Sequence, residues 1–231
     1  DVLVVGAGPA GLATAIELGM RGVRVLVVER NARVGVAPRA KTTNVRTRTH
    51  LRRWGIADRL AQEAPFGVDY PNNMVFVTRL AGHELARFAN AFNASPQRSD
   101  LYPEHGQWVP QYRLEQVLLE KARSLPCVEL RFDTAFVTAM QDEDGVTSTL
   151  RNADGEFDMR TRYLVGADGS RSTVRDLIGA RMEGRYGLTR AYNIIFRAPG
   201  MAAAHRHGPA AIYWQINSDG FSAVGPMDRE D

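Results

Sequence analysis

Two apolar runs flank an amphipathic stretch at the start of the chain. Val2–Val5 and Val23–Val28 are typical of parallel strands that are buried on both faces. Between them, apolar residues recur at helical spacing over Leu12–Ile16, and Gly22 is the usual kind of residue to end such a helix. The order strand, helix, strand predicts a βαβ unit over the first thirty residues.

The rest of the hydrophobic pattern predicts a mixture of helices and short strands. Helices are expected near 43–54, 56–61, 111–124 and 172–178, and strands near 74–78, 128–132, 134–140, 146–151, 156–165, 191–197, 211–216 and 221–224. The dipeptides Asp144-Gly145 and Asp154-Gly155 are tight-turn signals, so the runs they separate predict an antiparallel β-meander inserted into a βαβ protein. The last three runs predict an antiparallel sheet in a second domain.

The segment between the first strand and helix carries a glycine pattern with a physical purpose. Residues Gly6–Gly11 read G-x-G-x-x-G, in which Gly6 allows a tight turn, Gly8 lets a diphosphate approach the backbone and Gly11 lets the helix pack closely. Pro9 costs little in the first helical turn, where N–H groups lack partners. The helix N-terminus would then favour a diphosphate through its partial positive charge.

An acid follows the second predicted strand. Glu29 lies 18 residues past Gly11, close to the spacing of about 20 at which such a unit presents a carboxylate to a ribose diol. A carboxylate would repel a 2′-phosphate, so FAD and NAD fit this position and NADP does not. The alternative is a merely structural strand-turn-helix, because glycine-rich turns alone match by chance.

A second strand-turn-helix is predicted later in the chain. Tyr163–Val165 runs into Gly166-Ala167-Asp168-Gly169-Ser170, and Ser170 is expected to cap the helix over 172–178. Asp168 therefore stands in a tight turn before a helix N-terminus, either as a phosphate-site residue or as a simple turn or cap residue.

Composition limits the classes of partner. The chain has 231 residues, 44% hydrophobic residues and a net charge of +3, which is too small to imply nucleic acid binding. No apolar run has the length of a membrane span, and the single cysteine, Cys127, suits a reducing compartment, so we expect a cytoplasmic protein. Residues 30–59 hold nine arginines and lysines against one acid. This stretch could be a solvated helix face or a nucleic-acid patch, but because it follows the glycine turn we interpret it as a positive field for anionic groups.

Four stretches together resemble the class A FAD-dependent aromatic hydroxylases, the flavoprotein monooxygenases of the p-hydroxybenzoate and phenol hydroxylase type. They are residues 6–11 with 26–30, residues 38–40 leading to 51–55, residues 111–115 and residues 164–172. The resemblance implies a Rossmann-like βαβ FAD-binding domain over 1–178, with 66–108 reaching toward the substrate domain. Residues 179–231 would begin a truncated, mostly antiparallel substrate-binding domain.

The resemblance also implies a function and a set of cofactor-binding residues. The activity would be hydroxylation of a phenolic or related aromatic substrate with FAD, NAD(P)H and dioxygen. The residues implied to contact FAD are Gly6, Gly8, Pro9, Ala10, Gly11, Glu29, Arg30, Arg39, Ala40, Lys41, Gln111, Val137, Asp168 and Gly169. Alternatives are a flavoprotein of the same fold with other chemistry (an epoxidase, halogenase or reductase) and a non-catalytic FAD-binding module.

Two departures from the family pattern affect these expectations. The family has a later Gly-Asp turn on the ribityl chain, and this sequence has no Gly-Asp dipeptide. Either the chain is a fragment, which its abrupt ends favour and which we expect, or its flavin pocket is incomplete and its activity is in doubt. Lys41 stands where phenol hydroxylase-like members have an acid, so no phenol-activating base transfers from that position. Tyr192, Tyr213 and the histidines are possible bases by residue type only, and His205 with His207 is expected to be a loop rather than a metal site.

Overall fold

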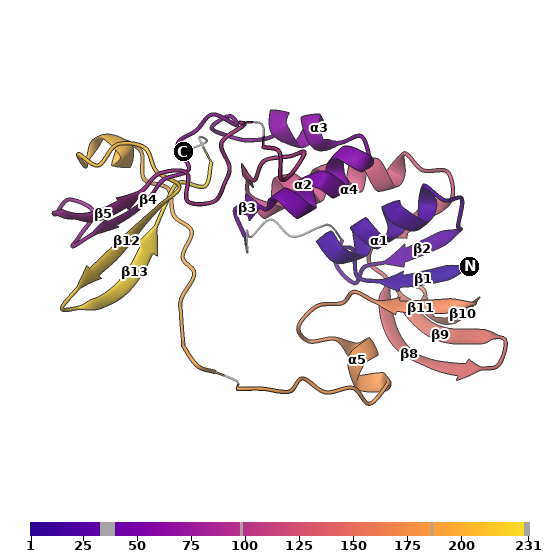
Figure 1. Cartoon of the computed structure of the whole chain (residues 1–231). Helices are drawn as coiled ribbons and strands as arrows, with labels where there is room; N and C mark the ends of the chain where they lie inside the picture. Colours follow the sequence, from indigo (N-terminus) through magenta and orange to yellow (C-terminus); the bar gives the residue numbers. More distant parts are fainter. Residues whose placement is uncertain (33–39, 98, 186, 229–231) are drawn as a thin grey trace. The chain divides into compact units, whose positions relative to one another are not determined.

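The structure is a computed structural model that describes residues 1–32, 40–97, 99–185 and 187–228. Within these residues, no helix combines the length and the hydrophobicity needed to cross a membrane. Contacts divide the chain into two units (Figure 1). Unit 1 comprises residues 1–37 and 114–190, and unit 2 comprises residues 38–113 and 191–231. The domain bounds given above, 1–178 and 179–231, stay a prediction.

Unit 1 is built on a four-stranded parallel sheet in the order β11-β1-β2-β7. Its strands are β1 (Val2–Val5), β2 (Val25–Val28), β7 (Val128–Arg131) and β11 (Tyr163–Gly166). Helix α1 (Pro9–Gly19) connects β1 to β2, which confirms the predicted βαβ unit. Helix α4 (Gln111–Arg123) precedes β7, and its buried residues recur at helical spacing as predicted.

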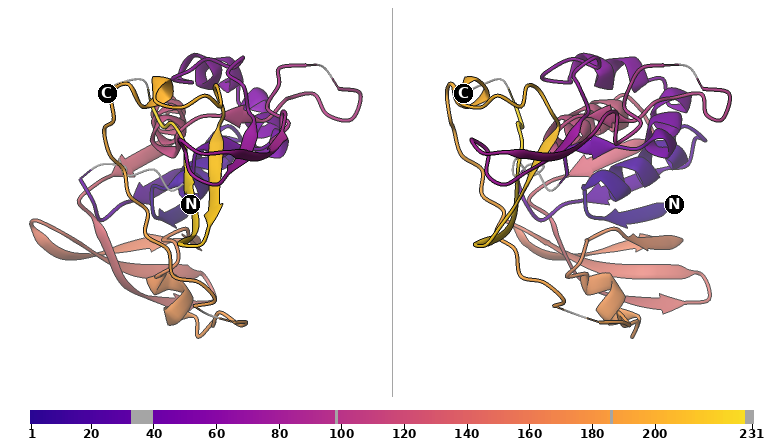
Figure 2. Two further views of the ribbon diagram at one scale, coloured as in Figure 1. Left: turned by 90° about the vertical axis from the view of Figure 1, so that its left-hand side faces the viewer. Right: turned by 60° about the vertical axis from the view of Figure 1, so that its left-hand side comes forward.

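The β-meander covers one face of the parallel sheet. It consists of β8 (Ala135–Asp142), β9 (Gly145–Asn152) and β10 (Gly155–Thr161), joined by the two predicted Asp-Gly turns (Figure 2). Leu3 and Val5 of β1 pack in one buried cluster with Leu150 of β9 and Val174 of helix α5 (Thr173–Leu177). Because strand side chains alternate between faces, the intervening residues of β1 and β2 lie on the opposite face of the sheet, which α1 contacts.

Two expectations for this region were wrong. The run over 156–165 is not one strand, because it breaks at Arg162 into β10 of the meander and β11, which pairs in parallel with β1. The chain thus passes from the meander into the parallel sheet within the single run over 156–165 that was expected to be one strand. Ser172, not Ser170, is the N-cap of α5, since its hydroxyl accepts the Arg175 N–H at 3.0 Å.

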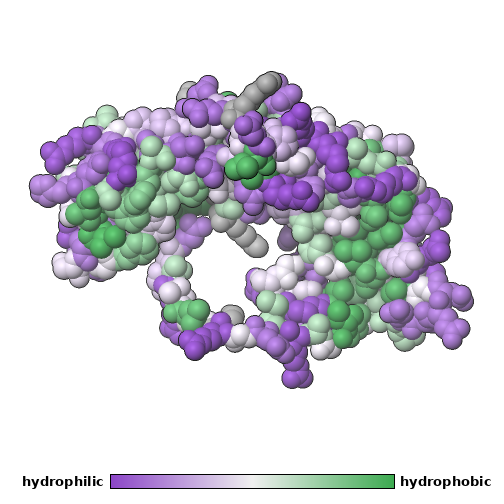
Figure 3. Space-filling view, in the orientation of Figure 1, coloured by the Kyte–Doolittle hydropathy of each residue, from purple (hydrophilic) through white to green (hydrophobic). Residues whose placement is uncertain are grey.

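Unit 2 is built on a four-stranded sheet in the order β13-β12-β4-β5. Its strands are β4 (Met74–Val77), β5 (Glu84–Phe88), β12 (Ile212–Asn217) and β13 (Gly220–Val224). Strands β4 and β12 are parallel neighbours, so segments far apart in the sequence share one sheet. Val75 and Val77 form a buried cluster with Ala210 and Tyr213, while hydrophobic residues remain exposed over β12 and β13 (Figure 3).

Two short helices and a ribbon complete unit 2. They are α2 (Val45–Arg53), α3 (Ala57–Gln62) and the antiparallel pair β3 (Thr42–Thr43) and β6 (Gln107–Trp108). Arg48 of α2 is buried, forms an ion pair with Glu104 at 3.0 Å and donates to the Ala57 carbonyl at 2.8 Å. Arg48 therefore belongs to the interior of unit 2, although it is part of the basic stretch over 30–59.

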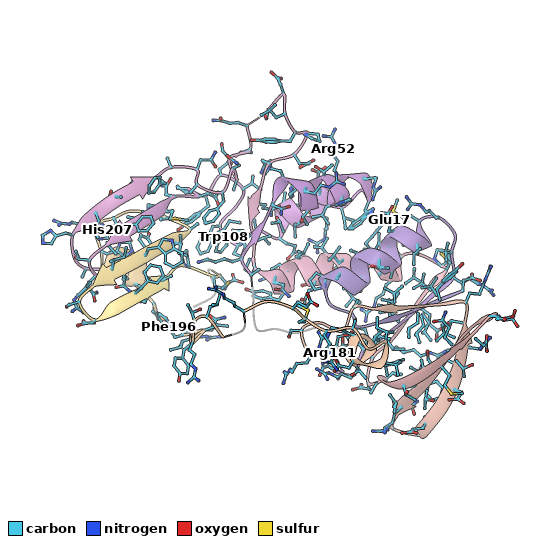
Figure 4. The ribbon with its side chains drawn as sticks, turned by 60° about the horizontal axis from the view of Figure 1, so that its bottom comes forward. Glu17, Arg52, Trp108, Arg181, Phe196 and His207 are labelled. Atoms are coloured by element: carbon cyan, nitrogen blue, oxygen red, sulfur yellow. The ribbon has the colours of Figure 1, made fainter. Side chains whose placement is uncertain are left out.

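The strand predicted over 191–197 is absent from the structure. Residues 191–198 have no regular secondary structure, and the short 3₁₀ helix η1 (Met201–Ala203) follows. Ile194 and Phe196, the latter labelled in Figure 4, are largely exposed. An alternating apolar pattern forms a strand only where a neighbouring strand accepts its hydrogen bonds, and among the described residues no strand pairs with this segment.

Candidate functional site

The two predicted loop-to-helix junctions meet at one edge of the parallel sheet. Val5 is level with Val28 on one side and with Gly166 on the other, so all three strands end together. The Gly6 N–H donates to the Val28 carbonyl and the Ala167 N–H donates to the Val5 carbonyl, both at 2.8 Å. This carboxyl edge is where open α/β sheets bind their ligands.

The three glycines of the turn have different surroundings. A Cβ on Gly11 would lie 1.9 Å from the Gly6 carbonyl oxygen, and one on Gly6 would lie 2.5 Å from the Ala167 carbonyl oxygen. Gly6 also has a φ of +105°, which side chains rarely adopt. A Cβ on Gly8 would meet no atom within 4 Å. Gly6 and Gly11 are therefore required by packing, whereas Gly8 borders open space.

The start of α1 can receive an anion. Gly8 is its N-cap and provides no side-chain hydrogen bond, Pro9 occupies the first turn, and the first turn contains no acidic residue. Backbone N–H groups at such a helix start have no intrahelical acceptor. The open space beside Gly8, with donors and the positive end of the helix dipole, fits the diphosphate of a dinucleotide.

Glu29 follows β2 and is tied to the same turn. Its Oε2 accepts the Ala7 N–H at 3.1 Å, and its Oε1 accepts the Asn31 N–H at 3.0 Å. The half-buried carboxylate thus lies beside the glycine turn, in the place where the sequence predicts an acid for a ribose diol.

The Asp168 side chain accepts hydrogen bonds from the start of helix α5. Its Oδ2 accepts the N–H groups of Thr173 at 2.7 Å and Val174 at 3.2 Å, and its Oδ1 accepts the Ser172 hydroxyl. Partial burial alone would raise the pKa of Asp168, but the hydrogen bonds from Ser172, Val174 and Thr173 outweigh it and lower the pKa below the usual value. The carboxylate points to α5, so the backbone of Ala167 and Asp168 is what faces Gly6.

Comparison with known proteins agrees with this geometry. The family described as FAD binding domain matches residues 1–231. The chain belongs to this FAD-binding family. Its relatives include 2,4-dichlorophenol 6-monooxygenase of Delftia acidovorans, 37% identical over 98% of this chain and 39% of the relative. Aklavinone 12-hydroxylase of Streptomyces purpurascens is 37% identical over 100% of this chain and 44% of the relative.

The chain is also similar to solved structures of flavin-dependent enzymes. The flavin-dependent monooxygenase PieE, in complex with FAD and substrate, has a TM-score of 0.85 and 32% identity over 100% of this chain and 41% of its own. Aklavinone-11 hydroxylase, with FAD and aklavinone, has a TM-score of 0.80 and 32% identity over 100% and 44%. The chain spans less than half the length of these relatives.

Three further residues implied by the resemblance lie together in unit 2. The Gln111 N–H donates to the Ala40 carbonyl and the Val109 N–H donates to the Lys41 carbonyl, both at 2.9 Å. The β3–β6 ribbon thereby brings Ala40 and Lys41 beside the start of α4. Arg39 lies outside the described residues. Whether these residues contact FAD stays a prediction.

The remaining implied residues lie in unit 1. Val137 stands where the pairing of β8 with β9 shifts between Phe136 and Thr138, which is the mark of a bulge. The start of this strand is next to Glu29, because the Thr134 N–H donates to the Glu29 carbonyl at 2.9 Å. Arg30 is exposed, and Gly169 has a φ of +83° in the second turn.

Sequence reasoning missed the surroundings of Lys41. Its Nζ donates to the Ala211 carbonyl at 2.8 Å, and a Cβ on Gly225 would lie 2.5 Å from that Nζ. Burial lowers the pKa of Lys41 to about 8. Of the two tyrosines considered as bases, Tyr192 is 96% exposed and Tyr213 is 5% exposed. Nothing local in the sequence pairs Lys41 with Ala211, since the contact depends on the tertiary fold.

Proposed function

We propose that this chain is the FAD-binding part of a flavin-dependent monooxygenase that hydroxylates a phenolic or related aromatic compound with NAD(P)H and dioxygen. The observation that carries the proposal is the convergence of Gly6 and Asp168 at the carboxyl edge of the sheet, beside the open space at Gly8. The proposal is supported by relatives that are named as monooxygenases and hydroxylases of aromatic compounds.

Each residue at the edge of the sheet has a specific role in this proposal. The N–H groups at the start of α1 hold the diphosphate, Gly8 leaves room for it, and Glu29 accepts hydrogen bonds from the adenosine ribose. Ala40, Lys41, Gln111, Val137 and the residues of the second turn contribute further cofactor contacts. When bound, FAD supplies hydride acceptance from NAD(P)H and activation of dioxygen toward an electron-rich ring.

Location in the cytoplasm is part of the same proposal. The reaction consumes NAD(P)H, and the only cysteine, Cys127, needs no disulfide partner.

Among the described residues, no three histidine, cysteine, aspartate or glutamate side chains are placed to hold a metal ion.

The first experiment tests cofactor binding separately from activity. The purified chain is unfolded, stripped of flavin, refolded and titrated with FAD, and binding is followed by quenching of flavin fluorescence. Saturable binding that Glu29→Gln weakens supports the assigned site. Failure of the folded chain to bind FAD, or full affinity in Glu29→Gln, would contradict it.

The second experiment tests the chemistry on the full-length protein that contains this chain. It is supplied with NADH or NADPH, isotopically labelled dioxygen and a series of phenols, and products are analysed by mass spectrometry. We expect a phenol that accelerates nicotinamide oxidation and acquires one labelled oxygen atom. Nicotinamide oxidation with a product that lacks the label would indicate another flavin chemistry, and FAD binding without turnover would indicate a non-catalytic module.

A further inference from the structure

An open cavity in unit 2 lies outside the residues assigned to FAD. Its volume is about 460 Å³, which is within the range of small-molecule sites, about 300–1,000 Å³. The turn between β4 and β5 contributes residues 81–83, and the end of η1 with the segment after it contributes residues 203–206. The ionisable residues that line it are His83, His205 and Arg206, so every one of them is basic.

Buried contacts fix the position of one wall of this cavity. The next residue, His207, has a side chain that is 2% exposed, and its Nδ1 lies 3.6 Å from Glu84 Oε2. Arg87 Nη2 donates to the His207 carbonyl at 2.7 Å and to Glu84 Oε2 at 2.7 Å. The segment that carries His205 and Arg206 is therefore held against strand β5, which carries Arg87.

The contacts of His205 determine which of its ring nitrogens can donate. Its Nδ1 accepts the His207 N–H at 3.3 Å, and its ring packs edge-on against Tyr213 with centroids 4.8 Å apart. Burial and, to a smaller extent, the neighbouring His207 lower the pKa of His205 from its ordinary value, which favours the neutral ring. A neutral imidazole whose Nδ1 accepts must carry its proton on Nε2, so Nε2 is a donor.

The other two basic side chains have unused donors. Neither the Arg206 guanidinium nor the His83 ring makes a hydrogen bond or ion pair with any residue that the structure describes. The nearby acid, Glu84, is already engaged by Arg87 and His207. A cavity lined by donors with no acceptor of opposite charge is complementary to an anion.

We propose that this cavity binds a small molecule through an oxyanion, a phosphate or a carboxylate group, with Arg206 and His205 Nε2 as the donors. The guanidinium matches the planar or tetrahedral oxygens of either group in a bidentate arrangement. In this proposal His83, which lines the same cavity from the β4–β5 turn, adds a third donor. This site is independent of the FAD proposal, because it uses none of the same residues.

The test is a titration of the full chain, labelled at its histidines, with inorganic phosphate and separately with acetate, at constant ionic strength. The chain has five histidines, so His50 and His105, which do not line the cavity, serve as internal controls. We expect saturable shifts of the His83 and His205 imidazole resonances, with smaller shifts of the controls. The probe that binds with the higher affinity, phosphate or acetate, identifies the kind of oxyanion group that the cavity prefers.

Two variants make the result specific. Arg206→Gln removes an exposed side chain without internal partners, so it should fold normally and bind the preferred anion about tenfold more weakly. Arg181→Gln makes the same charge change at an exposed position of unit 1 and should bind as the unaltered chain does. Shifts of all five histidines without saturation, or equal affinity in Arg206→Gln and Arg181→Gln, would overturn the proposal.

Discussion

The Cα of Asp168 lies 3.1 Å from the position that a Cβ on Gly6 would occupy. The first turn of the chain and the turn after the meander are therefore in backbone contact, although a long stretch of sequence separates them. The contact arises because β1 and β11 are parallel neighbours in register, with Val5 level with Gly166. Both turns consequently open at the same edge of the sheet, beside the start of α1.

Gly8→Ala and Gly11→Ala should separate ligand binding from folding. Gly8 has φ −73° and ψ −179°, which alanine adopts, and its Cβ would meet nothing within 4 Å. We expect stability within about 0.5 kcal/mol of the unaltered chain and FAD affinity at least about tenfold lower, because the methyl group enters the space for the diphosphate. Unchanged FAD affinity in folded Gly8→Ala would contradict the assigned site.

Gly11→Ala is the matched variant three residues later. Its Cβ would lie 1.9 Å from the Gly6 carbonyl oxygen, a backbone atom that cannot move aside cheaply. We expect a loss of about 1–3 kcal/mol in the free energy of unfolding even without FAD. Urea unfolding of both apoproteins measures the difference.

Removing the Asp168 carboxylate should destabilise unit 1 in a pH-dependent way. Asp168→Ala loses the carboxylate that accepts the Thr173 and Val174 N–H groups at the start of α5 and should cost about 1 kcal/mol near neutral pH. The folded-state pKa of Asp168 is lowered, so this contribution is present above the unfolded value of about 3.9 and disappears as pH falls through the lower folded value. Denaturant unfolding across this pH range provides the measurement.

The control for that prediction is on the same helix. The Asp176 side chain is 71% exposed and pairs only at the surface with Arg175, so Asp176→Ala should change stability by less than about 0.5 kcal/mol. An equal loss of unfolding free energy in Asp168→Ala and Asp176→Ala would mean that the negative charge near α5, rather than the hydrogen bonds of Asp168, stabilises unit 1.

Lys41 should titrate with a pKa of about 8, well below the ordinary lysine value of 10.5, because burial disfavours its charged form. The chain contains only one other lysine, Lys121, so ¹³C-methylation followed by NMR gives two lysine signals besides that of the N-terminal amino group, and Lys121→Arg assigns the two lysines. Between pH 8 and 10.5, Lys41 is protonated to a greater extent in the unfolded chain than in the folded chain. The free energy of unfolding should therefore increase as pH rises through this interval, because the penalty for burying the Lys41 charge is relieved.

The buried pair Arg48–Glu104 should contribute more to stability than any exposed pair on α2. The Arg48 side chain is 3% exposed, and Arg48→Met leaves Glu104 partly buried without its main partner, which should cost about 3 kcal/mol. Arg52 lies 3.9 Å from the same carboxylate but is 59% exposed (Figure 4), so Arg52→Met should cost less than about 1 kcal/mol. Thermal unfolding of the two variants compares them directly.

The sequence by itself determined the elements whose signals are local. Val2–Val5, the turn Gly6–Gly11 and Glu29 form the βαβ unit as predicted, because strand burial, turn geometry and helix periodicity are set by neighbouring residues. The Asp-Gly turns of the meander were predictable for the same reason.

Only the tertiary structure decided how distant segments pair. The break at Arg162 sends one strand-like run into two sheets, and among the described residues no strand pairs with the segment over 191–197, although its pattern alternates. The contacts of Lys41 with Ala211 and of Arg48 with Glu104 join residues far apart in the sequence. Strand pairing and burial of charge depend on which surfaces meet, and that information is not contained in the periodicity of either segment alone.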